Sequence, residues 1–478
     1  MKYKLQQLFK EYNIIGLSFD SRSVKPGDAF FAIVGEHVNG NHYLQQAFNA
    51  GAQLVITDDP EQLLDQRIVC VDDVRIALSY ASSIFYPKIP EHLIAVTGTN
   101  GKTSVVAYIR QLFGLLGQRS ASIGTLGIEL NREINNNIDT KGLTTVDVLT
   151  FRKILNDLAD NNINYVAFEA SSHGLQQKRI YDIPVIAAGF TSFSQDHLDY
   201  HLTMDEYLNA KLKLFTENLL PDGIAVINAD IVNIDFIKSY LNEQKIQVIT
   251  VGTSGDVRII KANSTVNRQA IEFSYLGEIY NIYTEIIGSF QGINLLIAAI
   301  LVHQAGFVFA DIVKKLPLIR AVRGRLERVT DKSHSFHIFV DYAHTPDALA
   351  NSLLELKKLL TGSGKLKVVF GCGGNRDQLK RPIMGKIAAE IADVVIITDD
   401  NPRDEDPAAI RQEILAEAKS AIEIPNRKQA IIDTVKWLQA EDILLIAGKG
   451  HENYQIIGNQ VIAMDDVEIA RQALGLKV

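Results

Sequence analysis

Gly98-Thr99-Asn100-Gly101-Lys102-Thr103-Ser104 is the most informative segment of this chain. The apolar run 93–96 precedes it, and residues 105–109, which have a helical pattern, follow it. A glycine-rich turn between a strand and a helix is typical of a phosphate-binding loop, because backbone N–H groups close around phosphates at the positive end of the helix. Lys102 can then reach the terminal phosphates, and the Thr103 hydroxyl can hold Mg²⁺. The alternative is a chance turn with a surface lysine.

Composition and charge narrow the class of protein. The chain has 478 residues, 47% of them hydrophobic and 22% charged, which indicates a globular protein of two to four domains. The net charge of −8 argues against general affinity for nucleic acid or an anionic membrane. Cys70 and Cys372 make no metal-binding spacing and favour a reducing cytosol. Since neither a signal core nor a run long enough to cross a bilayer is found, we expect a cytoplasmic protein. We also expect it to act as a monomer.

The sequence predicts an α/β protein of three domains, with boundaries at residues 1–88, 89–325 and 326–478. Strand-like runs at 30–34 and 52–57 form a small α/β unit that ends at Pro87 and Pro90. In the central unit, apolar strands at 165–168, 185–190 and 224–227 alternate with helices, which predicts a parallel, doubly wound sheet around the phosphate loop. Residues 271–283 form a predicted hairpin in a small antiparallel sheet appended to this domain.

A second boundary lies near Leu316-Pro317, and beyond residue 330 strands and helices alternate again. Strands predicted at 337–340, 366–370, 394–397 and 443–446 indicate a Rossmann-like C-terminal domain. The loops 371–377, 398–403 and 448–452 each follow one of these strands, so we expect them to share one crevice. None contains G-x-G-x-x-G, and their charges suit a zwitterion instead: arginine for carboxylate, and aspartate and glutamate for ammonium. These side chains are Arg376, Asp400, Arg403 and Glu452.

Three further positions in the central unit could carry chemistry. Glu169 follows a buried strand, at the sheet edge where ligands bind, and its carboxylate can bind Mg²⁺ or orient a nucleophile. A solvated strand-end residue is the alternative. The segment 196–201 around His197 has five polar or ionisable residues out of six, unlike a core segment. Lys211, on a helix predicted over 204–215, would by itself be interpreted as a solvated surface lysine.

These motifs occur in an order that resembles the Mur ligase family, which builds the peptidoglycan stem peptide. The likeness runs from about residue 20 to residue 455. The loop also resembles that of the folylpolyglutamate synthases. The resemblance implies a three-domain Mur ligase architecture and an ATP-dependent amide ligase that proceeds through an acyl phosphate. It further implies that Lys102, Glu169, His197 and Lys211 are catalytic, and that Lys211 is carbamylated by CO₂ and ligates Mg²⁺.

The same resemblance implies the ligand of each site. The ATP site comprises Gly98, Thr99, Asn100, Gly101, Lys102, Thr103, Ser104, Asn294, Arg325 and Asp341; the metal site comprises Thr103, Glu169, His197 and Lys211. For the UDP-N-acetylmuramoyl-L-alanyl-D-glutamate substrate the implied residues are Phe19, Ser21, Glu36, His37, Val38, Thr144, Thr145, Ser171, Gln177 and Arg179.

Asp400-Asn401-Pro402-Arg403 resembles the motif of family members that add meso-diaminopimelate, whereas lysine-adding members usually lack that arginine. The amino-acid residues implied are Arg376, Asp400, Asn401, Pro402, Arg403, Gly448 and Glu452. Two alternatives stay open. A lysine-adding or other ligase of the superfamily would not need Arg403. A non-enzymatic ATP-dependent switch would need only Lys102 and Thr103, and the conjunction of Glu169, His197 and Lys211 speaks against it.

Overall fold

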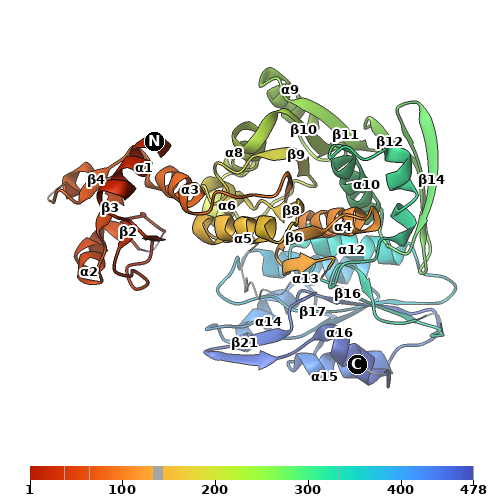
Figure 1. Ribbon diagram of the computed structural model, residues 1–478. Helices are drawn as coiled ribbons and strands as arrows, with labels where there is room; N and C mark the ends of the chain where they lie inside the picture. The colour runs from red at the N-terminus through yellow and green to blue at the C-terminus, as the bar shows by residue number, and fades with distance from the viewer. Residues whose placement is uncertain (37, 64, 133–143, 332, 477–478) are drawn as a thin grey trace.

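The computed structural model describes residues 1–36, 38–63, 65–132, 144–331 and 333–476. Its N-terminal part lies to one side of the rest of the molecule (Figure 1). This part is a four-stranded parallel sheet in the order β1-β2-β3-β4. The strands predicted at 30–34 and 52–57 are confirmed as β2 and β3, whereas β1 and β4 were missed because three residues give no periodicity. The elements are β1 Gly16–Ser18, β2 Asp28–Phe31, β3 Leu54–Thr57, β4 Ile68–Cys70, α1 Lys2–Glu11, α2 Leu44–Asn49 and α3 Val74–Phe85.

A ten-stranded sheet forms the central part, in the order β14-β13-β12-β11-β10-β9-β5-β8-β6-β7. Strands β12 to β6 of this order are parallel, and β7, β13 and β14 join antiparallel. The strands are β5 His92–Thr97, β6 Ser120–Gly124, β7 Gly127–Leu130, β8 Tyr165–Glu169, β9 Val185–Phe190, β10 Leu219–Asn228, β11 Gln247–Gly252, β12 Val257–Ser264, β13 Gln269–Tyr275 and β14 Glu278–Thr284.

Strand β5 shows why the central sheet is covered on both faces. Ile94 and Val96 pack into one core cluster with α4 and α10, while Leu93 and Ala95 pack into a second cluster with α5 and α8. Alternate side chains of a strand point to opposite faces, so this confirms the predicted doubly wound arrangement. The helices are α4 Lys102–Leu115, α5 Val148–Asp160, α6 Ser172–Gln176, α7 Leu198–His201, α8 Met204–Lys213, α9 Ile234–Glu243, α10 Ser289–His303 and α11 Phe309–Val313.

The predicted hairpin exists, but the small separate sheet does not. Strands β13 and β14 pair in the predicted place, and β12 joins them to the main sheet by pairing in parallel with β11, where Val251 lies opposite Val257. The pattern of apolar residues does not show which strands pair, so the sequence could not predict that the hairpin continues the main sheet. Asn294 of the predicted ATP site lies inside α10, which begins after Gly288, whose φ is 102°.

The C-terminal part lies against the central part and has a six-stranded sheet in the order β15-β16-β20-β17-β18-β19 (Figure 1). All pairs are parallel except β15 with β16, and the four predicted strands are confirmed as β16, β17, β18 and β20. No helix in the described ranges is long and apolar enough to span a membrane. The elements are β15 Glu327–Arg328, β16 His337–Asp341, β17 Leu366–Phe370, β18 Val394–Ile397, β19 Ile422–Glu423, β20 Ile443–Ala447, β21 Tyr454–Ile457, β22 Gln460–Ala463, α12 Pro346–Lys357, α13 Lys380–Ile391, α14 Pro407–Leu415, α15 Arg427–Lys436 and α16 Asp466–Ala473.

Candidate active site

The glycine-rich loop connects β5 to α4, as predicted. Gly98 has a φ of 144° and Gly101 a φ of 89°, a backbone region that favours glycine. Neither could carry a side chain without displacing a neighbour: a Cβ on Gly98 would lie 2.1 Å from Thr191 Oγ1, and one on Gly101 would lie 2.8 Å from Asn294 Oδ1. The loop therefore keeps its backbone amides at the start of a 14-residue helix, where an anion is favoured.

Lys102 lies folded over its own loop. Its Nζ donates to the carbonyl oxygens of Gly98 and Thr99, at 2.8 Å and 2.9 Å. Burial lowers the pKa of Lys102, and the nearby positive charge of Arg325 adds to that effect. The Thr103 hydroxyl accepts a 3.0 Å hydrogen bond from Arg325 Nη2. Lys102 and the Thr103 hydroxyl thus lie on the same side of the loop, close to the guanidinium of Arg325.

The loop opens onto a cavity of about 270 Å³ between the central and C-terminal parts. Gly98 and Lys211 are the only predicted ATP or metal residues that do not line it. Thr144, which was assigned to a different substrate, lines this cavity as well. The predicted residues on the wall are Thr99, Asn100, Gly101, Lys102, Thr103, Ser104, Thr144, Glu169, His197, Asn294, Arg325 and Asp341.

Glu169 ends β8 and is only 2% exposed, so the alternative of a solvated strand-end residue is wrong. Thr125 holds its carboxylate: the backbone N–H donates to Oε1 at 2.8 Å, and the hydroxyl donates to Oε2 at 3.1 Å. A Cβ on Gly124 would lie 2.2 Å from Oε1, so the carboxylate packs directly on the backbone. The sequence analysis missed Thr125, although its position just after β6 places it at the same sheet edge.

Lys211 is 1% exposed, which makes the alternative of a solvated surface lysine wrong. Its Nζ lies 4.1 Å from the centroid of the Tyr207 ring, and the Tyr207 hydroxyl lies 3.2 Å from Thr99 Oγ1. Burial lowers the pKa of Lys211 well below its ordinary value, and the charge of Lys102 lowers it further. Because an ammonium does not react with CO₂, this environment favours the neutral amine that carbamylation requires.

His197 begins the short helix α7 with a φ of 55° and lines the same cavity. Its Nε2 lies 3.4 Å from Asp196 Oδ2, and its backbone N–H donates to Asp196 Oδ1 at 2.9 Å. Burial lowers the pKa of His197 to about 4, which leaves a neutral imidazole whose nitrogen lone pair is free to act as a ligand.

The described part of the chain contains no ready cluster of three His, Cys, Asp or Glu side chains for a metal ion. The Thr103 hydroxyl and the Glu169 carboxylate nevertheless line one cavity with the phosphate loop. Magnesium prefers such oxygen ligands and usually takes only one or two from the protein, with the substrate's phosphates completing its shell. The donor set therefore fits Mg²⁺ as part of a phosphate site rather than as a closed protein site.

Contacts from the C-terminal part complete this cavity. Asn100 Nδ2 donates to Asp347 Oδ2 at 3.3 Å, and Glu355 accepts hydrogen bonds from both the backbone N–H and the hydroxyl of Ser289, each at 2.8 Å. Ser289 is the first residue of α10, so a carboxylate of α12 caps that helix. Both acidic side chains were missed, since nothing local in the sequence pairs α12 with these positions.

Asp341 is buried, and burial raises the pKa of its carboxyl group. Its carboxylate accepts from the backbone N–H groups of Leu326 at 2.6 Å and Ala343 at 2.9 Å, and from Ser352 at 3.3 Å. These bonds fix the segment that also carries Arg325, whose guanidinium lies 4.4 Å from the centroid of Tyr342.

A second cavity, of about 750 Å³, lies between the N-terminal and central parts. Its wall includes six of the residues predicted for the nucleotide-sugar substrate; His37 lies outside the described residues. Arg75, Asp147 and Tyr43 line it as well and were missed, since each is an ordinary surface residue in sequence. The predicted residues on its wall are Phe19, Ser21, Glu36, Val38, Gln177 and Arg179.

A hydrogen-bonded chain connects the two cavities. Gln177 Nε2 donates to Glu36 Oε1 at 3.0 Å, and Arg179 donates to Gln177 Oε1 at 2.7 Å and to the Thr145 carbonyl at 2.7 Å. The Thr145 hydroxyl donates to the Glu169 carbonyl and accepts from the Ser171 N–H. Thr145 and Ser171 therefore lie between the cavities, with Thr144 already on the wall of the central one.

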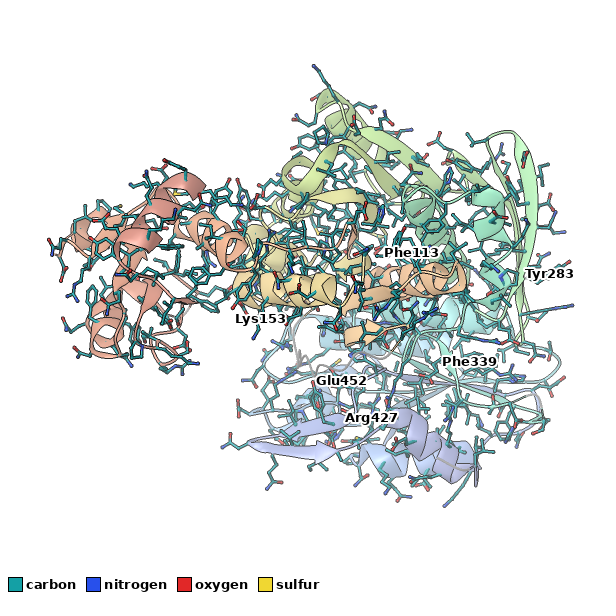
Figure 2. All side chains as sticks on the ribbon, viewed as in Figure 1. Phe113, Lys153, Tyr283, Phe339, Arg427 and Glu452 are labelled. Carbon is teal, nitrogen blue, oxygen red and sulfur yellow. The ribbon has the colours of Figure 1, made fainter. Side chains whose placement is uncertain are left out.

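The three predicted loops of the C-terminal part contact one another. Asn401 Nδ2 donates to Glu452 Oε2 at 2.9 Å, and a Cβ on Gly448 would lie 2.8 Å from Asp400 Oδ2. Arg403 has a φ of 52° and donates to the carbonyl of Gly374 at 2.7 Å. Arg376 is exposed and Pro402 is buried. Glu452 and Arg427 both lie in the C-terminal part of the molecule (Figure 2).

Comparisons with known proteins match the whole chain. The family description "Mur ligase family, catalytic domain" matches residues 13–92, "Mur ligase middle domain" matches 96–302, and "Mur ligase, glutamate ligase domain" matches 324–450. A UDP-N-acetylmuramoyl-L-alanyl-D-glutamate–2,6-diaminopimelate ligase of Rickettsia conorii is 52% identical over 99% of this chain and 98% of its own length. The ligase of the same name from Zymomonas mobilis is 44% identical over 99% and 97%.

Solved structures of Mur ligases and a folylpolyglutamate synthase are also similar to this chain. A structure described as UDP-N-acetylmuramoyl-L-alanyl-D-glutamate–2,6-diaminopimelate ligase has a TM-score of 0.69 and 33% identity, covering 97% of this chain and 95% of that one. A Mycobacterium tuberculosis folylpolyglutamate synthase complexed with ADP and AMPPCP has a TM-score of 0.65 at 19% identity, over 84% and 95% of the two chains. At that identity the likeness concerns the fold alone.

Proposed function

The chain belongs to the Mur ligase family, and we propose that it joins meso-2,6-diaminopimelate to UDP-N-acetylmuramoyl-L-alanyl-D-glutamate at the expense of ATP, in peptidoglycan precursor synthesis. The observation that carries this function is the likeness, over 99% of the chain, to relatives that bear this activity in their name. The three predicted domains 1–88, 89–325 and 326–478 then hold the nucleotide-sugar substrate, the ATP and the amino acid, respectively.

The reaction has two steps. The D-glutamate carboxylate attacks the γ-phosphorus of ATP, forming a C–O–P bond while the bond to ADP breaks. The amine of diaminopimelate then attacks the acyl carbon, a C–N bond forms, and phosphate leaves with the electron pair of the broken C–O bond. Carboxylate and triphosphate repel one another, so Lys102 and the loop amides must offset that charge in the transition state.

For the nucleotide we propose the loop 98–104, with Asn294 near the base, Arg325 at the phosphates and Asp341 at the ribose. Lys102 now bonds two loop carbonyls, which a bound phosphate would replace as its partner. The hydrogen bonds that already hold Asp341 to the backbone leave it preorganised for such a contact.

We assign Thr103, Glu169, His197 and a carbamylated Lys211 to Mg²⁺. Bound there, the ion would offset phosphate charge. Support comes from the oxygen donors beside the loop and from the burial of Lys211, which lowers the pKa of its amine well below the ordinary value. Thr125 would keep the Glu169 carboxylate aimed into the cavity.

The 750 Å³ cavity is the proposed site of the UDP-muramoyl moiety. Its dipeptide would extend along the Gln177–Arg179–Thr145 chain, past Ser171 and Thr144, toward the phosphate loop. The crevice of Arg376, Asn401, Arg403 and Glu452 would hold diaminopimelate, with Asp400, Pro402 and Gly448 shaping it. Both substrates would then reach the central cavity from opposite sides, in one chain acting as a monomer in the cytoplasm, where ATP is supplied.

A substrate screen tests this function: ATP, the UDP-muramoyl dipeptide and a panel of amino acids, with ADP release as the readout. We expect ADP release to require all three and to be fastest with meso-diaminopimelate. Equal rates with L-lysine would overturn the choice of amino acid. If ADP is released from ATP at the same rate without the other two substrates, the result would instead favour the non-enzymatic ATP-dependent switch.

A further inference from the structure

Lys449 is a buried cation in the C-terminal crevice that the proposed roles leave unused. Its side chain is fully buried, and Nζ lies 3.0 Å from Asn401 Oδ1 and 3.1 Å from Glu452 Oε2. The ring of Tyr454 lies beside it, with the centroid 5.5 Å from Nζ. A lysine is almost never completely buried unless it is paired, and here its partners are two residues proposed to bind the amino acid.

The contacts of Lys449 fix the orientation of the Asn401 amide. An ammonium only donates, so the amide atom that faces it must be the oxygen. The same oxygen accepts from the backbone N–H of Ile456 at 3.0 Å, and the amide nitrogen donates to Glu452 Oε2 at 2.9 Å. Both side chains are thereby held in one conformation.

Glu452 uses only one of its oxygens in this network. Oε2 accepts from both Lys449 and Asn401, whereas no hydrogen bond reaches Oε1 from any residue that the structure describes. The side chain is 17% exposed, so Oε1 is open to a ligand. Lys449 thus turns one carboxylate oxygen inward and leaves the other for a substrate ammonium.

Lys449 also changes the charge of the crevice. The loops 371–377, 398–403 and 448–452 carry the positive charges of Arg376, Arg403 and Lys449 and the negative charges of Asp377, Asp399, Asp400 and Glu452, so the ammonium of Lys449 changes their net charge from −2 to −1. Diaminopimelate, with two carboxylates and two amines, is neutral, and becomes an anion once its attacking amine loses a proton. Lysine carries one carboxylate and two amines and is a cation. The positive charge that Lys449 adds therefore disfavours lysine, a cation, relative to diaminopimelate.

We propose that Lys449 is a positioning residue for the amino-acid substrate, which orients Asn401 and Glu452 and whose buried charge selects against a cationic amino acid. The inference rests on the proposed function, since it assumes that this crevice takes diaminopimelate.

The test compares Lys449→Met, which removes the charge, with Lys449→Arg, which keeps it. For the Met variant we expect KM for diaminopimelate to rise roughly tenfold and the ratio of kcat/KM for diaminopimelate over lysine to fall by a similar factor. KM for ATP should stay unchanged. The Arg variant should keep the ratio. Lys314→Met is the matched control, because Lys314 pairs with Asp311 at the same three-residue spacing but is exposed.

An unchanged ratio in a folded Lys449→Met variant would overturn the inference while leaving the proposed function intact. An unmutated protein that does not use diaminopimelate would instead overturn the function itself. Should the Met variant fail to fold, Lys449→Gln keeps two N–H donors without the charge, and the same fall in the ratio is expected.

Discussion

Buried cations have different surroundings near the central cavity and in the loops of the C-terminal part. Lys102 lines the central cavity, and Lys211 lies near Lys102 without lining it; both are buried, burial lowers the pKa of each, and the charge of Lys102 lowers the pKa of Lys211 further. In the C-terminal part buried cations are paired: Lys449 with Glu452, and Arg381 with Glu405 and Glu413. The central cavity places the ammonium of Lys102 beside the backbone amides of the phosphate loop, which suits an anion, whereas the paired charges of the C-terminal part hold their side chains in fixed positions, which suits discrimination between ligands.

Replacing Lys211 should have the largest effect, because the proposed carbamate supplies a charge that no other group in the cavity replaces. Lys211→Ala should abolish ADP release, and a small added carboxylic acid should restore part of it. Lys213→Ala is the matched control: Lys213 lies on the same helix and bonds Gln176, and its loss should leave turnover near normal. An unmodified Lys211 in an active, bicarbonate-containing crystal would contradict this account.

Lys102→Ala should remove charge stabilisation at the γ-phosphate and lower kcat about 100-fold or more. The measurement is steady-state ADP release with all substrates present. A variant that folds normally and releases ADP at the wild-type rate would show that the central cavity does not act through this cation.

In the C-terminal crevice the expected effect is on selectivity. Bound lysine would leave Arg403 unpaired and desolvated, at a cost of about 2–5 kcal/mol. Arg403→Ala should therefore weaken diaminopimelate use and narrow its advantage over lysine by roughly 30-fold or more. Arginine and alanine tolerate the φ of 52° about equally, so backbone strain does not confuse the comparison. A kcat/KM ratio untouched by the substitution would reopen the lysine-adding alternative.

The buried amine of Lys211 should also cost stability until it is modified. Its pKa is depressed in the folded chain, so between that value and the ordinary 10.5 the unfolded chain binds the extra proton, and the free energy of unfolding rises with pH. In CO₂-free buffer, Lys211→Met should be more stable than the unmutated protein, by about 1–2 kcal/mol near neutral pH, and this difference should shrink toward pH 10.5. Thermal unfolding across this pH range measures it; a constant difference would argue against a neutral Lys211.

The smallest change in activity is expected where α12 of the C-terminal part contacts α10 of the central part. Glu355→Gln removes the negative charge that caps α10, which is worth about 0.5–1 kcal/mol, so KM for ATP should rise about two- to fivefold. Asp311→Asn, an exposed acidic residue in the short helix α11, serves as the control. No change in KM for ATP would show that the cap does not bear on the nucleotide site.

Features encoded in a short segment could be predicted from the sequence. The phosphate loop needs only a strand, two glycines and a helix start, all within about a dozen residues, and the strands 185–190 and 366–370 are found exactly where their apolar runs predict. The contact among the three C-terminal loops follows from the parallel order of their strands, because the carboxyl ends of these strands meet at one edge.

Features that depend on distant partners could not be predicted. Lys211 has the spacing of a surface residue; its own helix supplies only the Tyr207 ring beside it, whereas its charged neighbours Lys102 and Asp196 come from other segments. Thr125, Asp347 and Lys449 are ordinary residues in sequence, and they matter because folding brings them to Glu169, Asn100 and Asn401. The extension of the main sheet through β12 likewise depends on one pairing between separate segments.

The cap on α10 couples the binding of the amino acid to the binding of the nucleotide, and this coupling is thermodynamically reciprocal. Glu355 belongs to the part that holds the amino acid, and Ser289 begins the helix that carries Asn294 of the nucleotide site. If ATP strengthens this contact by some factor, the amino acid must bind more tightly by that same factor once ATP is present, and the reverse holds equally. With such a linkage each ligand binds more tightly when the other is present, so the state that holds both is favoured over either state that holds one, whichever ligand arrives first.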